Sequence, residues 1–371
     1  MKHIKAVRWL LIIVSILVAG SAGYSIFKIV TEKLPGKEIN EARESLARAK
    51  KNDASNFASN KLKEAESLYN AAMEEWAMQN EHFFWFRDFT KTRDLASKSL
   101  AISSDAKQQS VDEKNKLSKQ LKTDMIQAEK KIEKFESIYK SLPLARETFD
   151  FFNKGKMEYL EAKNELKTGD LKKAALLVER ANSNLLKAEN SAQRKIEQFF
   201  KNYPQWSKNA RLAEQLSKKG QTVILVNKIE SKCAVMKSGK TVKIFDAELG
   251  SNWMADKVMR GDRSTPEGVY KITEKKKGDK TKYYKALLIN YPNKEDESRF
   301  EMLKKSGSIP RTAQIGGLIE IHGDGGKGIH WTDGCIALRN KDMDQLYDLC
   351  SNGTQVIIIG SDKTLEEYLA E

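Results

Sequence analysis

The sequence predicts a multidomain chain with an N-terminal transmembrane helix, an elongated all-α helical region and a C-terminal, mainly β domain. Three observations support this order. No charged residue lies between Arg8 and Lys28. Only Pro143 of the six prolines falls between residues 36 and 203, and proline breaks helix interiors. From residue 220 onward, short β-branched and alternating segments replace the helical periodicity. The expected divisions are residues 1–34, 35–218, 219–361 and 362–371.

The composition is that of a folded protein, because 31% of the 371 residues are charged and 40% are hydrophobic. The net charge of +14 favours an anionic partner. Nucleic acid is not expected, since the sequence has no zinc-finger spacing, aromatic RNA-binding signature or compact basic helix. The three cysteines cannot all pair, and none has CxxC spacing. At least one thiol is therefore free.

The N-terminal segment determines the expected compartment. Residues 9–27 read WLLIIVSILVAGSAGYSIF, which approaches the length of about 20 apolar residues that spans a bilayer. Lys2, Lys5 and Arg8 precede it and favour a cytoplasmic N-terminus. We expect a single-pass inner (cytoplasmic) membrane protein whose C-terminal domain is periplasmic or otherwise extracytoplasmic. The small residues of Ala19–Gly23 leave a cleaved signal peptide as the alternative.

The second segment has apolar residues at helical spacing. One stripe runs from Leu62 to Trp76, and a second runs from Met157 to Ala188. Lys167–Asp170 interrupts the second stripe, with Gly169 suited to end one helix and Asp170 to begin the next. A helical hairpin is therefore predicted. Similar hairpins occur in tetratricopeptide repeats, but the lengths hold no fixed period, so a regular solenoid is not expected.

An aromatic cluster, His82-Phe83-Phe84-Trp85-Phe86, separates two of the expected helices. It has two interpretations. The cluster could be a platform that binds a partner, or it could be the packed turn at which two long helices meet. We expect the packed turn, with His82 as a capping or surface residue.

The C-terminal segment reads as strands with turn signals between them. The predicted strands are Thr222–Val226, Lys232–Met236, Thr241–Phe245, Gly268–Ile272, Ala286–Ile289, Leu318–Ile321 and Thr354–Ile359. Only Lys341–Cys350 has a clear helical stripe in this half of the chain. A mainly β domain follows from this pattern.

Reactive side chains are concentrated in residues 321–340, which contain two of the four histidines, one of the three cysteines and several glycines. A free thiol is mostly protonated at neutral pH, so a nucleophilic cysteine needs a base. We interpret Cys335 as the nucleophile and His322 as its base. Backbone N–H groups at Gly334 and Cys335 would stabilise an oxyanion. The spacing of the histidines and the cysteine fits no zinc pattern, so no metal is expected.

Three motifs of the β domain carry a resemblance to a known family. They are Gly261–Gly268 (GDRSTPEG), Glu320–Gly323 (EIHG) and Thr332–Ile336 (TDGCI). In this order they resemble the YkuD-domain family of L,D-transpeptidases, bacterial enzymes of the cell wall. The resemblance covers the β domain and not the helical region. It implies a β-sandwich-like catalytic domain that uses no metal or organic cofactor.

The resemblance also implies roles for single residues. His322 falls on the family's base, Thr332 on its Ser/Thr position, Gly334 on its glycine and Cys335 on its nucleophile. The implied reaction is acyl transfer through a Cys335 thioester, with a peptidoglycan stem peptide as donor and an amine or water as acceptor. Candidate substrate-binding residues are Gly323, His330, Trp331, Asp333 and Arg339.

Two positions depart from the family pattern. Asp333 stands where histidine is frequent, and Ala337 stands where many members have arginine. These features resemble a branch with L,D-hydrolase or amidase members that release wall-linked groups. Three hypotheses therefore stay open: a membrane-anchored acyltransferase, a hydrolase or amidase of the same fold, and a non-catalytic peptidoglycan-binding scaffold. Expected partners are stem peptides, the membrane through residues 9–27, and a wall or envelope protein through the helical region.

Overall fold

The computed structural model describes residues 2–31 and 34–370. The chain divides into two compact units, residues 1–125 with 162–176 and residues 126–161 with 177–371. The fold class predicted from the sequence is confirmed: a candidate apolar N-terminal helix, a helical region and a C-terminal β domain follow one another. The division of the helical region between the two units was not predicted, because three long helices run through both: α5 (Thr90–Lys134), α6 (Arg146–Thr168) and α7 (Leu171–Phe200).

The first unit begins with α1 (Lys2–Thr31), followed by α2 (Gly36–Lys51), the short α3 (Ala54–Phe57), α4 (Ser59–Glu81) and α5 (Thr90–Lys134). Within α1, Val7–Phe27 is long and apolar enough to cross a membrane by length and composition, and its large apolar side chains are exposed. Such a helix fits either an anchor or a signal peptide.

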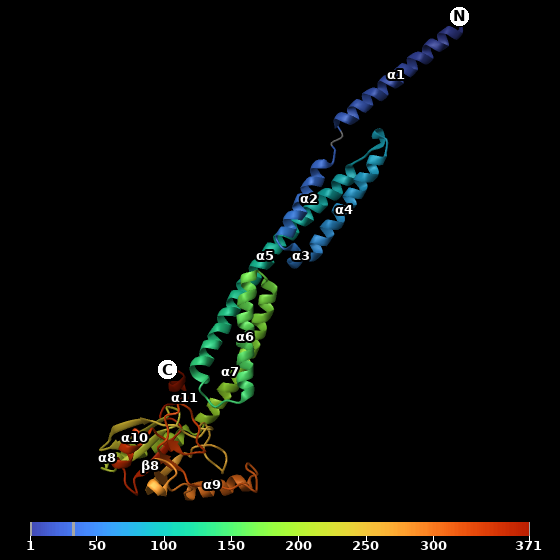
Figure 1. Ribbon diagram of the computed structural model, residues 1–371. Coiled ribbons are helices and arrows are strands. Elements are labelled where there is room, and N and C mark those ends of the chain that lie inside the picture. Colours follow the sequence, from blue (N-terminus) through green and yellow to red (C-terminus); the bar gives the residue numbers. More distant parts are fainter. Residues whose placement is uncertain (1, 32–33, 371) are drawn as a thin grey trace. The chain divides into compact units, whose positions relative to one another are not determined.

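Helices α2, α4 and α5 pack side by side through alanine-rich faces (Figure 1). Ile39, in the first turn of α2, shares a cluster with Met73 and Trp76 near the end of α4. Leu46, near the end of α2, shares another with Leu62 at the start of α4. Helices α2 and α4 are therefore antiparallel. The start of α2 and the end of α4 lie at the same end of this bundle.

The turn between α4 and α5 contains the aromatic cluster. The short helix η1 (Phe84–Phe86) forms this turn, as the sequence predicted. The expected packing is wrong, however: Phe83 is 61% exposed, Phe86 75%, Phe84 40% and Trp85 38%. The rings contact one another, and each keeps more than a third of its surface exposed. A turn sequence this rich in aromatic residues resembled a core segment, yet the alanine faces of the bundle already fill its interior.

The predicted helical hairpin is formed by α6 (Arg146–Thr168) and α7 (Leu171–Phe200). Gly169 has the left-handed φ of +90°, and the Asp170 carboxylate accepts a hydrogen bond from the N–H of Lys173 at 3.0 Å. Both residues therefore act as the sequence indicated. Closer to the β domain, α5 ends in a single π-helical turn, η2 (Phe135–Tyr139), whose Phe135 stacks on Phe152 of α6.

The β domain contains one eight-stranded sheet with the order β3-β2-β1-β8-β4-β5-β6-β7. The pairs β1–β8 and β6–β7 are parallel and the remaining pairs are antiparallel. Every predicted strand overlaps an observed one, but β7 was not predicted because it is only two residues long. The strands are β1 (Val223–Asn227), β2 (Lys232–Lys237), β3 (Lys240–Asp246), β4 (Gly268–Lys277), β5 (Lys285–Ile289), β6 (Glu320–His322), β7 (Ile336–Ala337) and β8 (Gln355–Ile359).

Helix α8 (Tyr203–Lys218) packs against β1 and β8. Its Trp206 is 1% exposed and donates its indole N–H to Glu267 at 2.7 Å. Glu267 belongs to the GDRSTPEG motif and also pairs with the fully buried Lys228 at 2.8 Å. This motif therefore attaches the last helix of the helical segment to the sheet. The expected boundary at residue 218 follows α8 and stays a prediction.

The β domain also contains helices that the sequence analysis did not identify. In addition to the predicted helix, α10 (Asn340–Leu349), it has α9 (Lys294–Lys305), so the expectation of a single helix in this half is wrong. Asn293 begins α9 with a capping box. Few apolar residues mark α9, since only Asp296 and Phe300 are buried, and this explains the missing periodicity. The short η3 (Gly278–Lys280) and α11 (Leu365–Leu369) complete the elements.

Candidate active site

The sheet register brings the candidate base and nucleophile onto neighbouring strands. β6 and β7 are parallel at the edge of the sheet, with His322 opposite Ala337. Cys335 directly precedes β7, so this pairing brings it to the same edge of the sheet as His322. The two residues are thirteen positions apart in sequence, and the β6–β7 pairing brings their segments together. Their order in the chain could not establish this.

His322 has one ring nitrogen occupied and one free. Its Nδ1 lies 2.6 Å from the carbonyl oxygen of Gly323. A carbonyl can only accept, so Nδ1 carries the proton and Nε2 carries the lone pair. Within the described part of the chain, the buried Nε2 has no hydrogen-bond partner. This tautomer is the one that a general base requires.

Aromatic side chains also pack against the His322 ring and fix its orientation. The ring of Tyr283, from the turn before β5, stacks on it with centroids 3.5 Å apart and planes 9° apart. Trp331 meets the ring edge-on at 6.1 Å. His322 itself is fully buried, and burial lowers the pKa of its imidazole below the ordinary value. The base is therefore neutral and fixed in orientation at neutral pH.

The Cys335 thiol is partly buried and protonated. Burial raises its pKa, although a hydrogen bond from the Glu320 backbone and the nearby charges of Lys282 and Lys257 act in the opposite direction. Its Sγ donates to the carbonyl oxygen of Leu318 at 3.7 Å, within the range for sulfur. Since the pKa of the base is lowered and that of the thiol is raised, the resting pair is a neutral thiol and a neutral imidazole.

The turn before Cys335 depends on Thr332 and Gly334. The buried Thr332 hydroxyl donates to the carbonyl oxygen of Cys335 at 2.7 Å and accepts from the N–H of Gly334 at 3.2 Å. Gly334 has a φ of +132°, and a Cβ there would lie 2.6 Å from the carbonyl oxygen of Ser264. A side chain at this position would be both strained and in collision. Glycine is therefore required for the turn that presents the thiol.

A cavity of about 760 Å³ opens at Cys335. Trp331, Thr332, Asp333 and Glu320 contribute to its wall, and six cationic side chains also line it. They are Lys257, Arg260, Arg263, Lys276, Lys280 and Lys282. Lys276 is neutralised by Glu320 at 2.8 Å. The remaining excess of positive charge makes this cavity suited to an anionic ligand.

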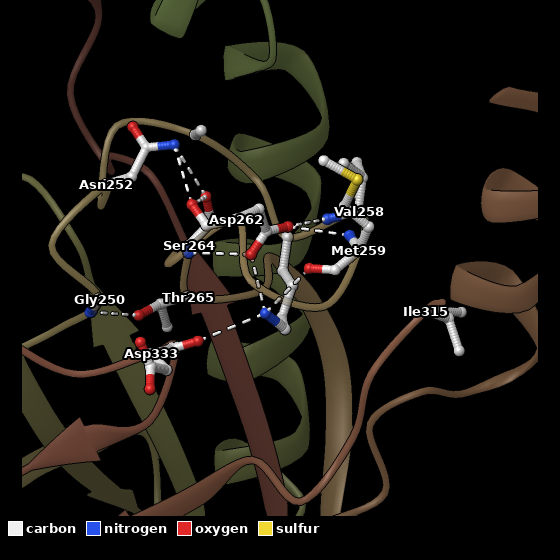
Figure 2. A network of polar contacts seen from close by, with 12 residues as sticks. Gly250, Asn252, Val258, Met259, Asp262, Ser264, Thr265, Ile315 and Asp333 are labelled. Atoms are coloured by element: carbon white, nitrogen blue, oxygen red, sulfur yellow. Dashed lines mark hydrogen bonds and ion pairs between the residues drawn. The ribbon is translucent and has the colours of Figure 1, made fainter. Parts of the chain in front are cut away.

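A buried ion pair supports the cavity wall behind the thiol (Figure 2). Asp262 accepts hydrogen bonds from the N–H groups of Val258 and Met259 at 2.7 and 2.9 Å. Its other oxygen accepts from Lys257 Nζ at 2.8 Å and from the N–H of Ser264 at 3.1 Å. Lys257 is 3% exposed, and its Nζ also lies 3.4 Å from the carbonyl oxygen of Asp333.

The GDRSTPEG motif, which contains Asp262 and Ser264, also links this network to the sheet. The Thr265 hydroxyl accepts from the N–H of Gly250 at 2.9 Å (Figure 2). The carbonyl of Thr265 accepts from Lys228 Nζ at 3.0 Å. Lys228 also donates to the carbonyl of Ala255 and to Glu267. The GDRSTPEG motif therefore connects the nucleophile turn to the core of the domain.

Comparison with known proteins is consistent with this geometry. Residues 221–358 match the model of the YkuD family, described as the L,D-transpeptidase catalytic domain. This part of the chain is a YkuD domain. The resemblance noted from the three motifs is confirmed. The match does not extend over the helical region.

Solved structures similar to the YkuD domain include L,D-transpeptidases from Xylanimonas cellulosilytica, Mycobacterium smegmatis and Stackebrandtia nassauensis. Their sequence identities to this chain are 15%, 14% and 19%, with TM-scores of 0.25, 0.26 and 0.25. Each match covers 38% of this chain and 61%, 59% and 57%, respectively, of the other. The chain therefore spans less than two thirds of these structures. Among curated proteins, none matches.

Of the predicted substrate-binding residues, Trp331 and Asp333 line the Cys335 cavity of the YkuD domain. Gly323 supplies the carbonyl that orients His322. His330 lies elsewhere: its Nδ1 accepts from the N–H of Leu249 at 3.0 Å, and its Nε2 lies 3.2 Å from the Ser231 hydroxyl. Both ring nitrogens of His330 therefore hold the loop between β6 and β7 against the residues around Leu249 and Ser231.

Arg339 does not line the cavity at Cys335. It begins α10, is 59% exposed, and pairs with Asp342 at 2.8 Å and Asp246 at 3.5 Å. Together with His330 it lines a second cavity, of about 710 Å³, which includes Ser141–Pro143 of the same unit. A substrate-binding role for Arg339 stays a prediction, and it would concern this second cavity.

Sequence reasoning missed Glu248 and Tyr283. Glu248 is 9% exposed and accepts from the N–H of Gly328 at 2.6 Å and from the indole of Trp331 at 2.7 Å. Its backbone also forms a bridge with Ala337 of β7. Glu248 thus fixes the loop between the base and the nucleophile. Neither residue lies in a recognisable motif, so no signal in the sequence pointed to them.

Proposed function

We propose that this protein is a membrane-anchored cysteine acyltransferase that acts on peptidoglycan stem peptides through a thioester on Cys335. The observation that carries the proposal is the state of His322. Its Nδ1–H is bound to Gly323, and its buried Nε2 is free on the strand beside the thiol. The YkuD family match supports the reaction class.

The reaction begins with a neutral pair. As Sγ of Cys335 attacks the carbonyl carbon of the donor peptide, Nε2 of His322 takes the thiol proton. The tetrahedral intermediate then collapses, the amine leaves with that proton, and a thioester remains. An acceptor amine attacks the thioester and loses its proton to Nε2. The new amide departs, and the proton returns to the sulfur.

The oxyanion of each intermediate needs backbone donors. Of the two N–H groups expected to serve, that of Gly334 already donates to the Thr332 hydroxyl. Within the described part of the chain, the Cys335 N–H makes no such bond. We therefore assign the Cys335 N–H to the oxyanion and give Gly334 and Thr332 a positioning role. The cations at the cavity mouth, including Arg260, Arg263 and Lys282, would bind the carboxylates of a stem peptide.

The same thioester can be released by water. Asp333 and Ala337, which depart from the family pattern, favour the hydrolase or amidase alternative, in which wall-linked groups are detached. Asp333 is exposed on the cavity wall and places a negative charge near the incoming acceptor. Muropeptide mass spectrometry of cells with and without the protein separates the two reactions, because gained and lost cross-links differ in mass.

Replacing Cys335 by Ala tests the nucleophile directly. We expect loss of stem-peptide cleavage and exchange, because no thioester can form, and loss of the acyl adduct that a carbapenem makes with the wild-type protein in intact-mass spectrometry. Cys350, buried with a pKa raised to about 11, gives a control variant, Cys350→Ala, that should keep the adduct. Undiminished turnover without Cys335 would contradict the mechanism. A wild-type thiol that never forms an adduct would favour the scaffold alternative.

The proposed location follows from α1. With the segment from Trp9 to Phe27 as an uncleaved anchor, the YkuD domain faces the wall from the outer side of the cytoplasmic membrane. We propose that the helices between α1 and the YkuD domain act as a spacer or bind a wall or envelope protein. Cleavage of the segment as a signal peptide is the alternative, and the mass of the mature protein distinguishes the two.

A further inference from the structure

The turn between α4 and α5 exposes four consecutive aromatic side chains, here called the aromatic tip (Phe83–Phe86). Phe86 is 75% exposed and Phe83 61%. Soluble surfaces seldom gather large apolar side chains in this way, and such patches mark sites of interaction. Nothing in the proposed chemistry of the YkuD domain uses them.

The aromatic tip is a preformed structure. Arg87 donates from Nε to the carbonyl of His82 at 3.0 Å and from Nη2 to the carbonyl of Asn80 at 2.9 Å. The N–H of Asp88 donates to the side chain of Gln79 at 3.0 Å. These bonds close the turn from the inside, so the rings are directed outward without support from a hydrophobic core. The loop is therefore already ordered in the folded unit, and binding through the rings would lose little further conformational entropy.

The bundle places the aromatic tip at the end where α2 begins. Trp76 packs against the cluster that contains Ile39, and α4 continues from Trp76 to Glu81 over about 8 Å. Gly36 lies only about 4.5 Å before Ile39 on the antiparallel helix α2. The aromatic tip thus projects beyond the first residue of α2 (Figure 1).

The length of chain before α2 limits its distance from the apolar segment of α1. From Phe27 to Thr31 the helix rises about 6 Å, and the steps from Thr31 to Gly36 span at most about 18 Å. If α1 crosses the bilayer, the start of α2 lies within about 24 Å of Phe27, whatever the direction of the connection. The polar layer of a bilayer occupies several ångströms of that distance.

We propose that the aromatic tip inserts into the interfacial layer of the same bilayer that holds α1. Trp and Phe are side chains that favour this layer, because their rings tolerate contact with both headgroups and acyl chains. A second attachment point would fix the tilt of the bundle over the membrane. A protein partner is less favoured, because a stable interface buries about 800 Å² per side, and a projecting turn of four residues offers less.

This inference rests on the membrane-anchored form of the proposed function. It is tested on the full chain in vesicles of phosphatidylcholine and phosphatidylglycerol at 3:1, with a nitroxide attached at Phe84→Cys in a Cys335→Ser background. Cys233 and Cys350 are buried and their thiol pKa values are raised, so they do not take the label. Collision with oxygen, which concentrates in lipid, is compared with collision with a water-soluble nickel chelate.

We expect the oxygen-to-nickel ratio at Phe84→Cys to be several-fold higher than at Met157→Cys, a control that is 65% exposed on α6. Equal ratios at the two positions would overturn the inference. Protection from both reagents would also overturn it, because it indicates protein contact. A label at Ile16→Cys in α1 separates the failures. If Ile16→Cys is in lipid and the aromatic tip is in water, only this inference fails, whereas water at Ile16→Cys refutes the anchor itself.

Discussion

Replacing Asp262 by Asn should destabilise the YkuD domain strongly, because Asp262 neutralises a buried lysine. Both carboxylate oxygens are occupied: one faces Val258 and Met259 N–H groups, and the other faces Lys257 Nζ and an N–H of Ser264. An Asn side chain has only one acceptor oxygen. Whichever way it is turned, its NH₂ group faces two other donors.

The expected magnitude follows from the burial of the pair. Lys257 is 3% exposed and Asp262 9%, so removing one partner leaves a buried charge without a counter-ion. The remaining acceptors of Lys257, the carbonyls of Met259 and Asp333, lie at 3.3 and 3.4 Å. Breaking a pair of this kind costs about 3–5 kcal/mol. The equilibrium constant for opening of the domain should therefore rise about 10² to 5 × 10³-fold.

Labelling of the buried Cys233 thiol measures this opening without assuming that the whole chain unfolds in one step. Cys233 lies in β2 with no exposed surface, so a thiol reagent reaches it only when the sheet opens. The rate is read by peptide mass spectrometry. Asp246→Asn is the matched control: its carboxylate is 65% exposed in its ion pairs, and a rate change below about fivefold is expected. Equal rates for both variants would refute the argument from buried charge.

Two further outcomes are expected at the nucleophile turn and its base. Gly334→Ala should reduce acylation of Cys335 by a carbapenem at least tenfold, because the new Cβ would meet the Ser264 carbonyl at 2.6 Å with φ at +132°, a conformation that costs about 1–3 kcal/mol. Gly317→Ala is the control on the same cavity: its new Cβ would lie 3.9 Å from the nearest atom, Cδ of Pro292, so it should keep the wild-type rate. The acylation rate should also fall only below about pH 6.5, since burial lowers the pKa of His322 and the protonated ring cannot accept the thiol proton. A low-pH midpoint above 6.5 would contradict this argument, because it would mean that the pKa of the base is raised and not lowered.

Local signals in the sequence were sufficient for the elements with strong periodicity or special backbone needs. The hairpin at Gly169 was predictable because a left-handed residue and a following N-cap are properties of a few neighbouring residues. Helix α9 was missed for the converse reason: it buries little, and its capping box begins a mostly polar segment. The strand β7 is too short for alternation to be visible, although it places Cys335.

The site was predictable where chemistry limits the choice of residue. A nucleophilic thiol, a histidine base and a glycine turn have few substitutes, so Cys335, His322 and Gly334 could be identified from residue type and motif. The lysine and carboxylate groups around them could not, because many polar residues of the chain look alike in sequence. Which of them are buried in pairs, as Lys257 and Asp262 are, depends on contacts between distant segments.

The order of the segments, the domain class and the reacting groups follow from local composition and motifs, so they could be predicted from the residues alone. The remaining features arise from contacts between distant parts of the chain. The β6–β7 register brought the segments of His322 and Cys335 to one edge of the sheet, a carbonyl contact selected the tautomer of His322, and packing placed Arg339 on a different cavity. The exposure of the aromatic tip also depends on which faces of α2, α4 and α5 meet. Each of these depends on which distant surfaces meet, and no local pattern encodes that.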